Sequence, residues 1–413
     1  MRLRRKNCGL FLLVVALITI KVVMAMVTPP SLPVIYYLQV QGNKRSPDAN
    51  NPWGRYNNAT LSVWYALPIH HPDLETFLTN KALFLPFSLQ LLLLLVKLPL
   101  IGADMLIAYV LFRLGKHMWP ATNKPVIALL LWLANPYATF VTEMLGAVDV
   151  IPVASIIVAL YLLIRRKHIL GATSLAAGIA IKLFPIVTVP AFLYSSLVQG
   201  SREVKILISG ALAVCGLLAY VSWSGFPFSE AYYTQSFTEF ILGVQSLYGL
   251  GASVDFIGLA TFSVIISYLL VYEFRPAMFQ RPIAMTLFVL LAYVAFLDFQ
   301  VEYMLWLIPL FVIVNFTQRK TVPLLISILA TAFTLGFFIN DGYTTTSGWT
   351  LLFFNRSADW ATSLLSSQFI DVVLRPLLRT LLSAFMVLST FVLWASTGDS
   401  GTQDSRVDQP ESL

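Results

Sequence analysis

Long, nearly uninterrupted apolar runs dominate this 413-residue sequence and constrain its fold more than any other feature. Apolar residues make up 58% of the chain and charged residues only 11%, whereas about a quarter of the residues in a soluble domain are charged. Because one membrane span needs about 20 apolar residues, the sequence predicts an all-α, polytopic transmembrane bundle of about twelve spans. This composition excludes a soluble enzyme, a DNA-binding protein and a small disulfide-rich secreted domain.

The apolar runs also set the expected positions of the spans. The run 84–113 is too long for one upright helix and contains Pro99, so we expect it to be tilted or kinked. The run 169–198 has no polar interruption, and Pro185 is the reason for dividing it into two spans. The expected spans lie near residues 9–27, 84–113, 125–142, 148–164, 169–183, 184–198, 206–223, 257–274, 282–298, 303–317, 321–339 and 371–396.

Basic residues segregate along this pattern and predict its orientation. Cytoplasmic connections of membrane proteins carry an excess of Lys and Arg, and the segment ahead of the first run is rich in both. We therefore predict a multi-pass protein, in a plasma membrane, with both termini in the cytoplasm. Residues 1–396 form the expected single membrane domain, and residues 397–413 an expected disordered tail. The few basic residues expected on the outer side are Lys44, Arg45, Arg55, Lys81 and Arg356.

The long connections fall on the predicted outer side, at residues 28–83, 224–256 and 340–370. The first of these loops is the richest in polar and aromatic side chains, and its Asp48 lies close to amides and aromatics, a combination typical of sugar recognition. Such a carboxylate can act as a general base when partly desolvated. Adjacent histidines point in different directions, so we predict no metal site. The loop's candidate substrate-binding residues are Arg55, Tyr56, His70 and His71.

Three ionisable residues interrupt the early runs, where burial of charge is costly. Lys21 lies near the outer end of the first span, and we expect it to extend its amine to that interface. Lys97 and Asp104 are separated by two helical turns and so share one face. We expect these two residues to form an internal ion pair.

Further cations lie at the predicted outer ends of later spans. Lys182 precedes Pro185, which frees backbone groups, and it either binds a phosphate as a point charge or extends to the interface. Arg375 and Arg379 are one helical turn apart. Two guanidinium groups on one face suit a phosphate or diphosphate, although lipid headgroups are an alternative ligand.

Several segments together resemble the GT-C superfamily of membrane glycosyltransferases, which use polyprenyl-phosphate sugars, and especially its bacterial and archaeal mannosyltransferase-like members. The resemblance extends over residues 97–309, behind a long first outer loop, and consists of short motifs in a shared order. The matching pieces are Lys97-Leu98-Pro99 with Asp104, Asn135-Pro136 with Gly146-Ala147-Val148-Asp149, Lys182-Leu183-Phe184-Pro185, and the segment from Gln300 through Glu302, Tyr303 and Trp306 to Pro309.

The resemblance implies a GT-C-like fold and an inverting hexosyltransferase, most often a mannosyltransferase. Its site faces outward, its donor is a polyprenyl-phosphate sugar, its acceptor is lipid-linked or extracytoplasmic, and it needs no further cofactor. An acid of the first outer loop, here Asp48, would be the base, with Asp149, Asp73 and Glu143 as alternatives. Cations would hold the departing phosphate. The implied substrate-binding residues beyond the first loop are Asp149, Lys182, Gln300, Glu302, Tyr303, Arg375 and Arg379.

Two other functional classes suit a bundle of this kind. One is a noncatalytic subunit with a GT-C-like fold, and the other is a secondary transporter, although we find no similarity between the two halves of the chain. The discriminating feature is whether Asp48 or Asp149 faces one outward cavity together with Lys182 and the Arg375/Arg379 pair.

Overall fold

The computed structural model describes residues 2–28, 87–182, 184–199, 256–274, 278, 280–296, 302–317, 322–338 and 375–398. Across these residues the chain is helical and contains no strand. The expected span 206–223 lies outside the described residues, as do nearly all of the three long loops and the tail from residue 399. The all-α class expected from the apolar runs is therefore confirmed for the part of the chain that is described.

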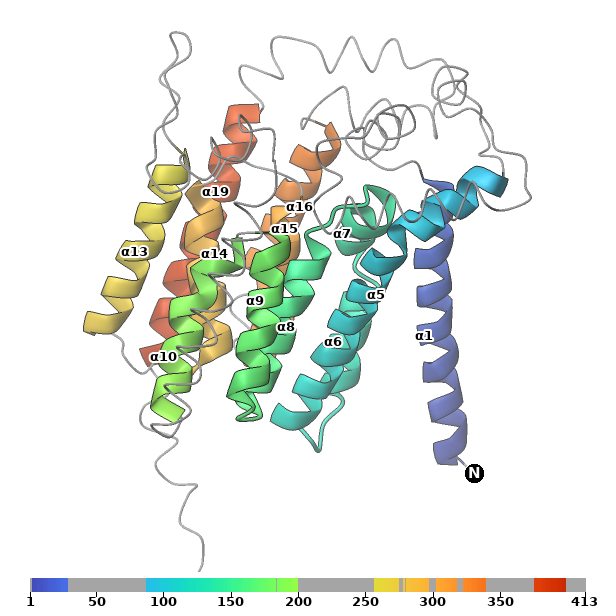
Figure 1. Ribbon diagram of the computed structural model, residues 1–413, viewed down its shortest axis with the longest axis horizontal. Coiled ribbons are helices and arrows are strands. Elements are labelled where there is room, and N and C mark those ends of the chain that lie inside the picture. Colours follow the sequence, from blue (N-terminus) through green and yellow to red (C-terminus); the bar gives the residue numbers. More distant parts are fainter. Residues whose placement is uncertain are drawn as a thin grey trace, which may run out of the picture.

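The described helices lie side by side with alternating directions (Figure 1). Eleven of the expected apolar runs coincide with helical segments, two of which are interrupted by a π-helix or a 3-10 helix. The elements are α1 (Arg2–Val27), α5 (Phe87–Met118), α6 (Lys124–Leu133), α7 (Pro136–Thr139), the π-helix η2 (Phe140–Met144), α8 (Val150–Ile164), α9 (His168–Ile181), the 3-10 helix η3 (Phe184–Thr188), α10 (Val189–Gln199), α13 (Phe256–Phe274), α14 (Pro282–Phe296), α15 (Tyr303–Thr317), α16 (Val322–Phe338) and α19 (Arg375–Gly398).

Several of these helices are long and apolar enough to cross a membrane. Three meet that test singly, at Gly9–Val27, Gln90–Met118 and Leu377–Ala395, and a fourth span is possible if the bent pair Lys124–Leu133 and Pro136–Met144 counts as one. The remaining apolar helices are shorter. A helix of 15 residues such as α8 is about 22 Å long, less than the roughly 30 Å of a bilayer core. The described helices therefore include three or four candidate spans.

Proline has different effects in the two long runs, for which we expect a tilt or kink of 84–113 and a division of 169–198. Helix α5 continues through Pro99 without a break, and Figure 1 shows its N-terminal part leaning across the end of α1. The run 169–198 does divide, because α9 ends at Ile181 and a 3-10 helix begins at Phe184. The division expected at Pro185 is thus confirmed, and it leaves Lys182 in extended backbone.

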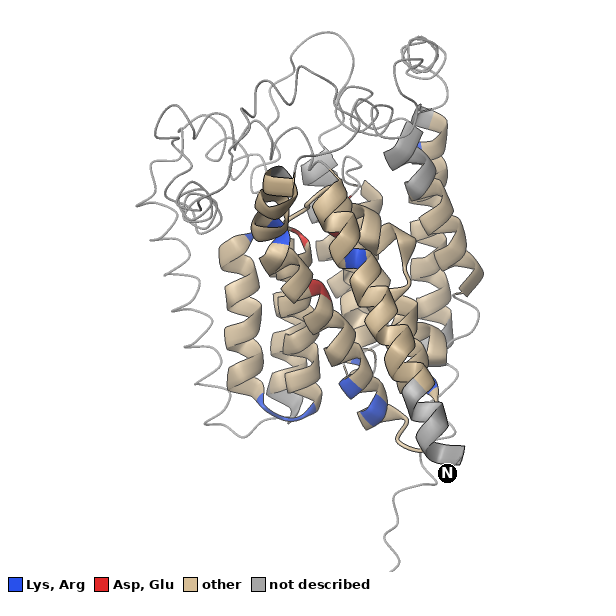
Figure 2. Cartoon of the chain, turned by 90° about the vertical axis from the view of Figure 1, so that its right-hand side faces the viewer, with Lys and Arg blue, Asp and Glu red and all other residues tan. Residues whose placement is uncertain are grey.

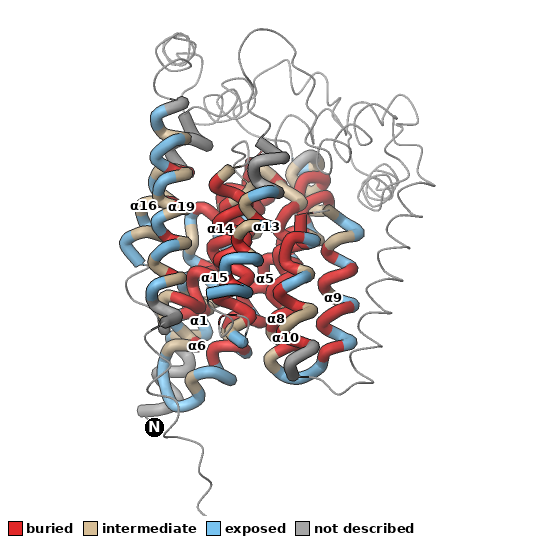
Figure 3. The backbone as a smooth tube through the Cα atoms, turned by 90° about the vertical axis from the view of Figure 1, so that its left-hand side faces the viewer, coloured by how far each residue is buried: buried red, intermediate tan, exposed pale blue. Residues whose placement is uncertain are grey.

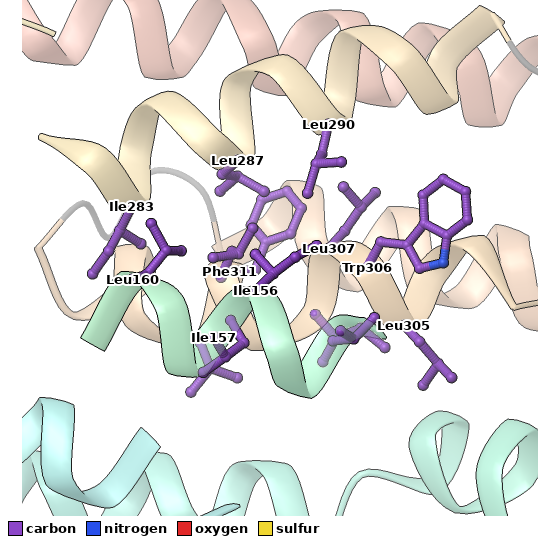
Figure 4. Close-up of a cluster of buried hydrophobic side chains, with 14 of the residues drawn as sticks. Ile156, Ile157, Leu160, Ile283, Leu287, Leu290, Leu305, Trp306, Leu307 and Phe311 are labelled. Carbon is purple, nitrogen blue, oxygen red and sulfur yellow. The ribbon is translucent and has the colours of Figure 1, made fainter. Parts of the chain in front are cut away.

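Helices α14 and α15 form the centre of the bundle. Almost every side chain of α14 is buried, which is typical of a helix that is apolar all round and enclosed by neighbours. Figure 4 shows Leu287 and Leu290 of α14 facing Phe311 of α15 and Ile156 of α8. Helices α1, α13, α16 and α19 lie further out, and Figure 3 shows more exposed positions along α16 and α19 than along α14 and α15.

Small residues allow α8 and α9 to pack closely. A Cβ added at Gly178 would lie 2.9 Å from the Cβ of Ser155, and one at Gly171 would lie 3.1 Å from the carbonyl oxygen of Ala159. Ser174 also donates a hydrogen bond across the pair to the carbonyl of Ser155, at 3.0 Å. Close helix contact through small residues is typical of membrane bundles, and here it fixes the position of the α9 end that carries Lys182.

Basic residues gather at one end of the bundle. Figure 2 shows Lys and Arg in the turns at the lower end, whereas the acidic positions of the described helices lie mainly in the upper half. Lys124 at the start of α6 donates to the carbonyl of Phe316 near the end of α15, at 3.3 Å, and its amine lies 5.0 Å from the ring of Trp119. The connections α5–α6 and α8–α9 and the end of α15 are therefore at the end opposite to Lys182.

Candidate functional site

Lys182 lies at a break in the helical path. It is the C-cap of α9, with extended backbone at φ −149° and ψ 140°, and the 3-10 helix η3 begins two residues later. Its side chain keeps 39% of its surface exposed. The break therefore presents a cation at the end of the bundle that is opposite to the basic turns.

Asp149 approaches Lys182 from the start of α8. The preceding turn contains Gly146 at φ 75°, a left-handed conformation that glycine adopts without strain. Asp149 does not cap its helix with its side chain. Instead, one carboxylate oxygen lies 2.7 Å from the Lys182 amine, and the other accepts a hydrogen bond from Trp306 Nε1 at 2.9 Å. Both oxygens of this buried carboxylate are therefore engaged.

Glu302 completes the group from the residue before α15. Its Oε1 atom lies 3.9 Å from the Lys182 amine, and 27% of its side-chain surface is exposed. Burial is the main cause that raises the pKa of Glu302, and the negative charge of Asp149 raises it further, while Lys182 acts in the opposite direction. One lysine is thus shared unequally by two carboxylates. We refer to Asp149, Lys182 and Glu302 as the open site.

Aromatic side chains form the wall behind the open site. The ring of Phe184 stacks on Trp306 with centroids 3.6 Å apart and an interplanar angle of 1°. Tyr303 lies 4.5 Å from Trp306, and Tyr293 of α14 lies 6.3 Å from it. Trp306 and Phe184 are buried, whereas Tyr303 is partly exposed. The stack fixes the indole that holds Asp149 and leaves Tyr303 as the aromatic nearest to solvent.

A second group of charges lies inside the bundle between α1, α5 and η2. The Lys21 amine is 3.1 Å from Asp104 and 3.2 Å from Glu143, and the side chains of all three are at most 1% exposed. Glu143 belongs to the π-helix, an irregularity that brings its carboxylate to α1. We refer to Lys21, Asp104 and Glu143, together with the neighbouring Lys97, as the sealed cluster.

Lys97 fixes the backbone of the same region. Its buried amine donates to the carbonyls of Glu143 at 2.7 Å, Thr28 at 2.9 Å, Met144 at 3.1 Å and Ala25 at 3.2 Å. The π-helix and the end of α1 are thereby tied to α5. A buried ammonium satisfied by carbonyl oxygens is a stable arrangement where no water is available.

Two sequence predictions are wrong at this point. Lys21 does not extend to the outer interface, because the carboxylates of α5 and η2 offer ionic partners inside the bundle. Lys97 and Asp104 share a helix but do not pair with each other. Asp104 pairs with Lys21 from another helix, and Lys97 turns to carbonyls of α1 and η2. In both cases the partner is remote in the sequence, so spacing along one helix could not predict it.

The segment between α6 and α8 connects the two groups of charges. Asn135 caps α7 by accepting hydrogen bonds from the backbone amides of Tyr137 and Ala138, and Pro136 occupies the first helical position, where proline is favoured. From this cap the chain passes through Glu143 of the sealed cluster and reaches Asp149 of the open site five residues after the end of η2.

The structure brings together only some of the predicted site residues. Asp149, Lys182 and Glu302 meet, and Tyr303 lies next to them. Arg375 and Arg379 both lie in the first turns of α19, a helix that packs against α14 and α16. The described part of the chain contains no group of three or more His, Cys, Asp or Glu that could hold a metal. Outside the described residues lie Asp48, Arg55, Tyr56, His70, His71, Asp73 and Gln300.

Trp306 and Phe184 are site residues that the sequence analysis did not select. Both belong to motifs that carry the resemblance, so a signal was present, but an aromatic near a span end is ordinarily an interfacial anchor. The contacts that define their roles are the hydrogen bond from the indole N–H of Trp306 to Asp149 and the ring stack of Trp306 with Phe184. These contacts join α15 with α8 and η3.

The chain was compared with known protein families and curated proteins. No family model and no curated protein matches it.

Proposed function

We propose that this chain is a GT-C-like membrane glycosyltransferase that moves a hexose, mannose in the first instance, from a polyprenyl-phosphate donor to a lipid-linked or extracytoplasmic acceptor. The observation that carries the proposal is the convergence of three separate motifs of the resemblance. Asp149, Lys182 and the pair Glu302 and Trp306 come from distant segments and meet in one partly exposed site. A shared order of weak motifs gains weight when their polar residues contact one another.

The composition of the open site suits this chemistry. A lysine is a compact point charge that can bind a phosphate, and Lys182 is accessible at a helix break. A carboxylate beside an accessible aromatic, here Glu302 beside Tyr303, suits the hydroxyls and apolar face of a sugar. Ionisable residues at the ends of membrane helices that face an accessible site are functional candidates by default.

In the proposed reaction the acceptor hydroxyl attacks the anomeric carbon in one inverting displacement. A base takes the hydroxyl proton, the bond from the sugar to the phosphate oxygen breaks, and the polyprenyl phosphate leaves with the electron pair. Lys182 stabilises the charge that develops on the leaving oxygen, and Arg375 and Arg379 are further candidate ligands of the phosphate. For the base, the resemblance implies Asp48 of the first loop, and the open site offers Glu302.

Orientation follows from the distribution of charge. The turns at the end opposite to the open site are rich in Lys and Arg (Figure 2), which favours a cytoplasmic location for that end. The proposal therefore puts the open site on the outer face of a plasma membrane, with the start of α1 in the cytoplasm. A lipid-linked donor would reach the site from within the bilayer.

The test is transfer of radiolabelled mannose from a short-chain polyprenyl-phosphate donor to acceptors in membrane extracts. Wild type, Lys182→Met and Lys167→Met are compared after purification in detergent. Lys167 precedes α9 at its other end and is exposed, so its variant is a matched control. We expect transfer by wild type and Lys167→Met, and a loss of about 100-fold in Lys182→Met, the usual effect of removing one stabilising donor.

Two outcomes contradict the proposal in different ways. Equal transfer by wild type and Lys182→Met would detach the activity from the open site. If wild type transfers no sugar from mannosyl, glucosyl or galactosyl donors, the proposed glycosyltransferase activity is rejected. The noncatalytic subunit and the secondary transporter then remain as alternatives.

A further inference from the structure

The two carboxylates of the open site differ in how fully they are engaged. Asp149 is buried, with one oxygen 2.7 Å from Lys182 and the other hydrogen-bonded to Trp306 at 2.9 Å. Glu302 is more exposed, and its nearer oxygen is 3.9 Å from the lysine amine, beyond hydrogen-bond distance. Asp149 is therefore held in a fixed ion pair, whereas Glu302 has a carboxylate that an incoming molecule can reach.

We infer that Glu302 is the group that accepts the proton of the acceptor hydroxyl, while Asp149 acts as the positioning residue for Lys182. The inference rests on the proposed glycosyl transfer and replaces Asp48 as its base. It assigns separate tasks to two carboxylates that share one lysine, from their engagement by neighbouring groups.

Electrostatics support this division. Asp149 and Lys182 compensate each other, so an ionised Glu302 adds an unbalanced negative charge beside the buried carboxylate of Asp149. Burial and the charge of Asp149 both raise the pKa of Glu302, and a base works best when its pKa approaches the working pH.

Proton transfer to Glu302 also balances the charge of the reaction. The acceptor O–H bond breaks and its proton moves to a carboxylate oxygen of Glu302, while the acceptor oxygen forms a bond to the anomeric carbon. The bond from that carbon to the phosphate oxygen breaks, and the phosphate leaves with the electron pair and one additional negative charge. Glu302 becomes neutral as the phosphate gains this charge, so the total charge around Lys182 does not change.

The backbone at Glu302 suits a fixed base. The residue immediately precedes α15, and its carbonyl accepts a hydrogen bond from the amide of Leu305, so the first turn of the helix holds it. Trp306, one turn further on, is fixed by its stack with Phe184 and its bond to Asp149. Glu302 is thus attached to a rigid element, as accurate placement of a catalytic group requires.

The experiment compares the pH dependence of mannosyl transfer in wild type, Glu302→Gln, Asp48→Asn and Glu273→Gln. Glu273 is exposed near the end of α13 and serves as the matched control. Donor binding is measured in parallel by equilibrium dialysis with the labelled polyprenyl-phosphate mannose. We expect kcat/KM of wild type to rise with pH through the raised pKa of Glu302, because the base must be ionised to accept a proton.

Glu302→Gln should lose transfer by about 100- to 10,000-fold, the usual contribution of a general base, and should lose the rise with pH while its donor affinity stays within a few-fold. In Asp48→Asn and Glu273→Gln, kcat/KM should still rise with pH as in wild type. A Glu302→Gln variant that transfers like wild type would overturn the inference and leave the proposed function standing. If Asp48→Asn is the only variant whose kcat/KM no longer rises with pH, the inference is also overturned and the proposed function stands.

Two further outcomes are also decisive. If Glu302→Gln does not fold, Glu302→Asp is measured instead, because it keeps a carboxylate at a different depth. In this variant the increase of kcat/KM with pH should occur at a different pH than in wild type. An increase at the same pH as in wild type would count against Glu302 as the base. Absence of transfer by wild type would contradict the proposed function itself, and this inference would fail with it.

Discussion

The sealed cluster and the open site share one arrangement of charges in opposite surroundings, and the sealed cluster contains Lys97 in addition. Each places one lysine between an aspartate and a glutamate from other segments: Lys21 with Asp104 and Glu143, and Lys182 with Asp149 and Glu302. In the first group all three side chains are at most 1% exposed, whereas in the second Lys182 is 39% exposed. A charged group of this kind can hold helices together or carry out chemistry, and access to it decides which.

Helix geometry explains the difference in access. Lys21 and Asp104 lie within α1 and α5, so their side chains face other helices. Lys182, Asp149 and Glu302 each lie at a helix boundary, and there Lys182 and Glu302 stay partly exposed while Asp149 is buried. We therefore expect the sealed cluster to govern stability and the open site to govern activity.

The sharpest test of this comparison is the removal of each lysine in turn. Lys21→Met leaves two buried carboxylates without their cation and should cost about 3–5 kcal/mol of stability, typical of breaking a buried ion pair. Lys182→Met should cost less, because the Lys182 amine is partly screened by solvent and Asp149 keeps its hydrogen bond from Trp306. Thermal unfolding of both purified variants measures the difference. Equal losses would show that the two groups do not differ in the way their exposure indicates.

Asp149→Asn tests whether the open site acts through position. The amide can still accept from Trp306 but no longer holds the lysine as an ion pair, so Lys182 should become less well placed. We expect a loss of transfer of about 100-fold, the scale of small misplacements in an active site, with a nearly unchanged melting temperature. A large fall in melting temperature with unchanged activity would assign Asp149 to the structural group instead.

Gly146 connects the two regions and should show an intermediate effect. Alanine at φ 75° should cost about 1–2 kcal/mol and displace Asp149, lowering transfer as well. Gly102→Ala is the control, because it lies within α5 with open space around the added Cβ and should be neutral or stabilising by up to about 1 kcal/mol. Melting temperature and transfer rate are measured for both. A Gly146→Ala variant equal to the control would show that the turn is not needed.

The smallest expected effect is the pH dependence of stability at Glu302. Because its pKa is raised above 4.5 in the native state, the group contributes its full stability below the ordinary glutamate value, and this contribution is lost as pH rises through the raised value. The melting temperature of wild type relative to Glu302→Gln should therefore fall slightly over that window. If the melting temperature of wild type relative to Glu302→Gln increased with pH, the native site would favour the ionised carboxylate of Glu302.

The apolar runs predicted helices well because burial in a bilayer depends on composition over about 20 residues, which is a local property. The number of about twelve spans stays a prediction, because the described helices include three or four that are long and apolar enough to cross a membrane, and others such as α8 and α15 have only 15 residues. One helix end was also accessible to prediction, where Pro185 follows α9, whereas the expected span 125–142 ran through the break that Asn135 and Pro136 make between α6 and α7.

Side-chain partners were not accessible in the same way. Lys21 looked like an interfacial lysine because its distance from the span end is all that sequence offers, and its carboxylate partners lie on α5 and η2. Trp306 has the position of an ordinary interfacial aromatic near a span end, and only its contact shows that its indole donates to Asp149. Each of these roles depends on a contact between segments far apart in the chain.

The sequence by itself determined the helical class, the apolar character of the bundle and the candidate polar residues, because these follow from composition and short-range periodicity. Only the tertiary structure decided which lysine is sealed and which is open, because the approach of distant helices sets both the ionic partners and the access of solvent. Asp149, Lys182 and Glu302 could be named as candidates in advance, but their meeting required α8, α9 and α15 to pack at one end of the bundle.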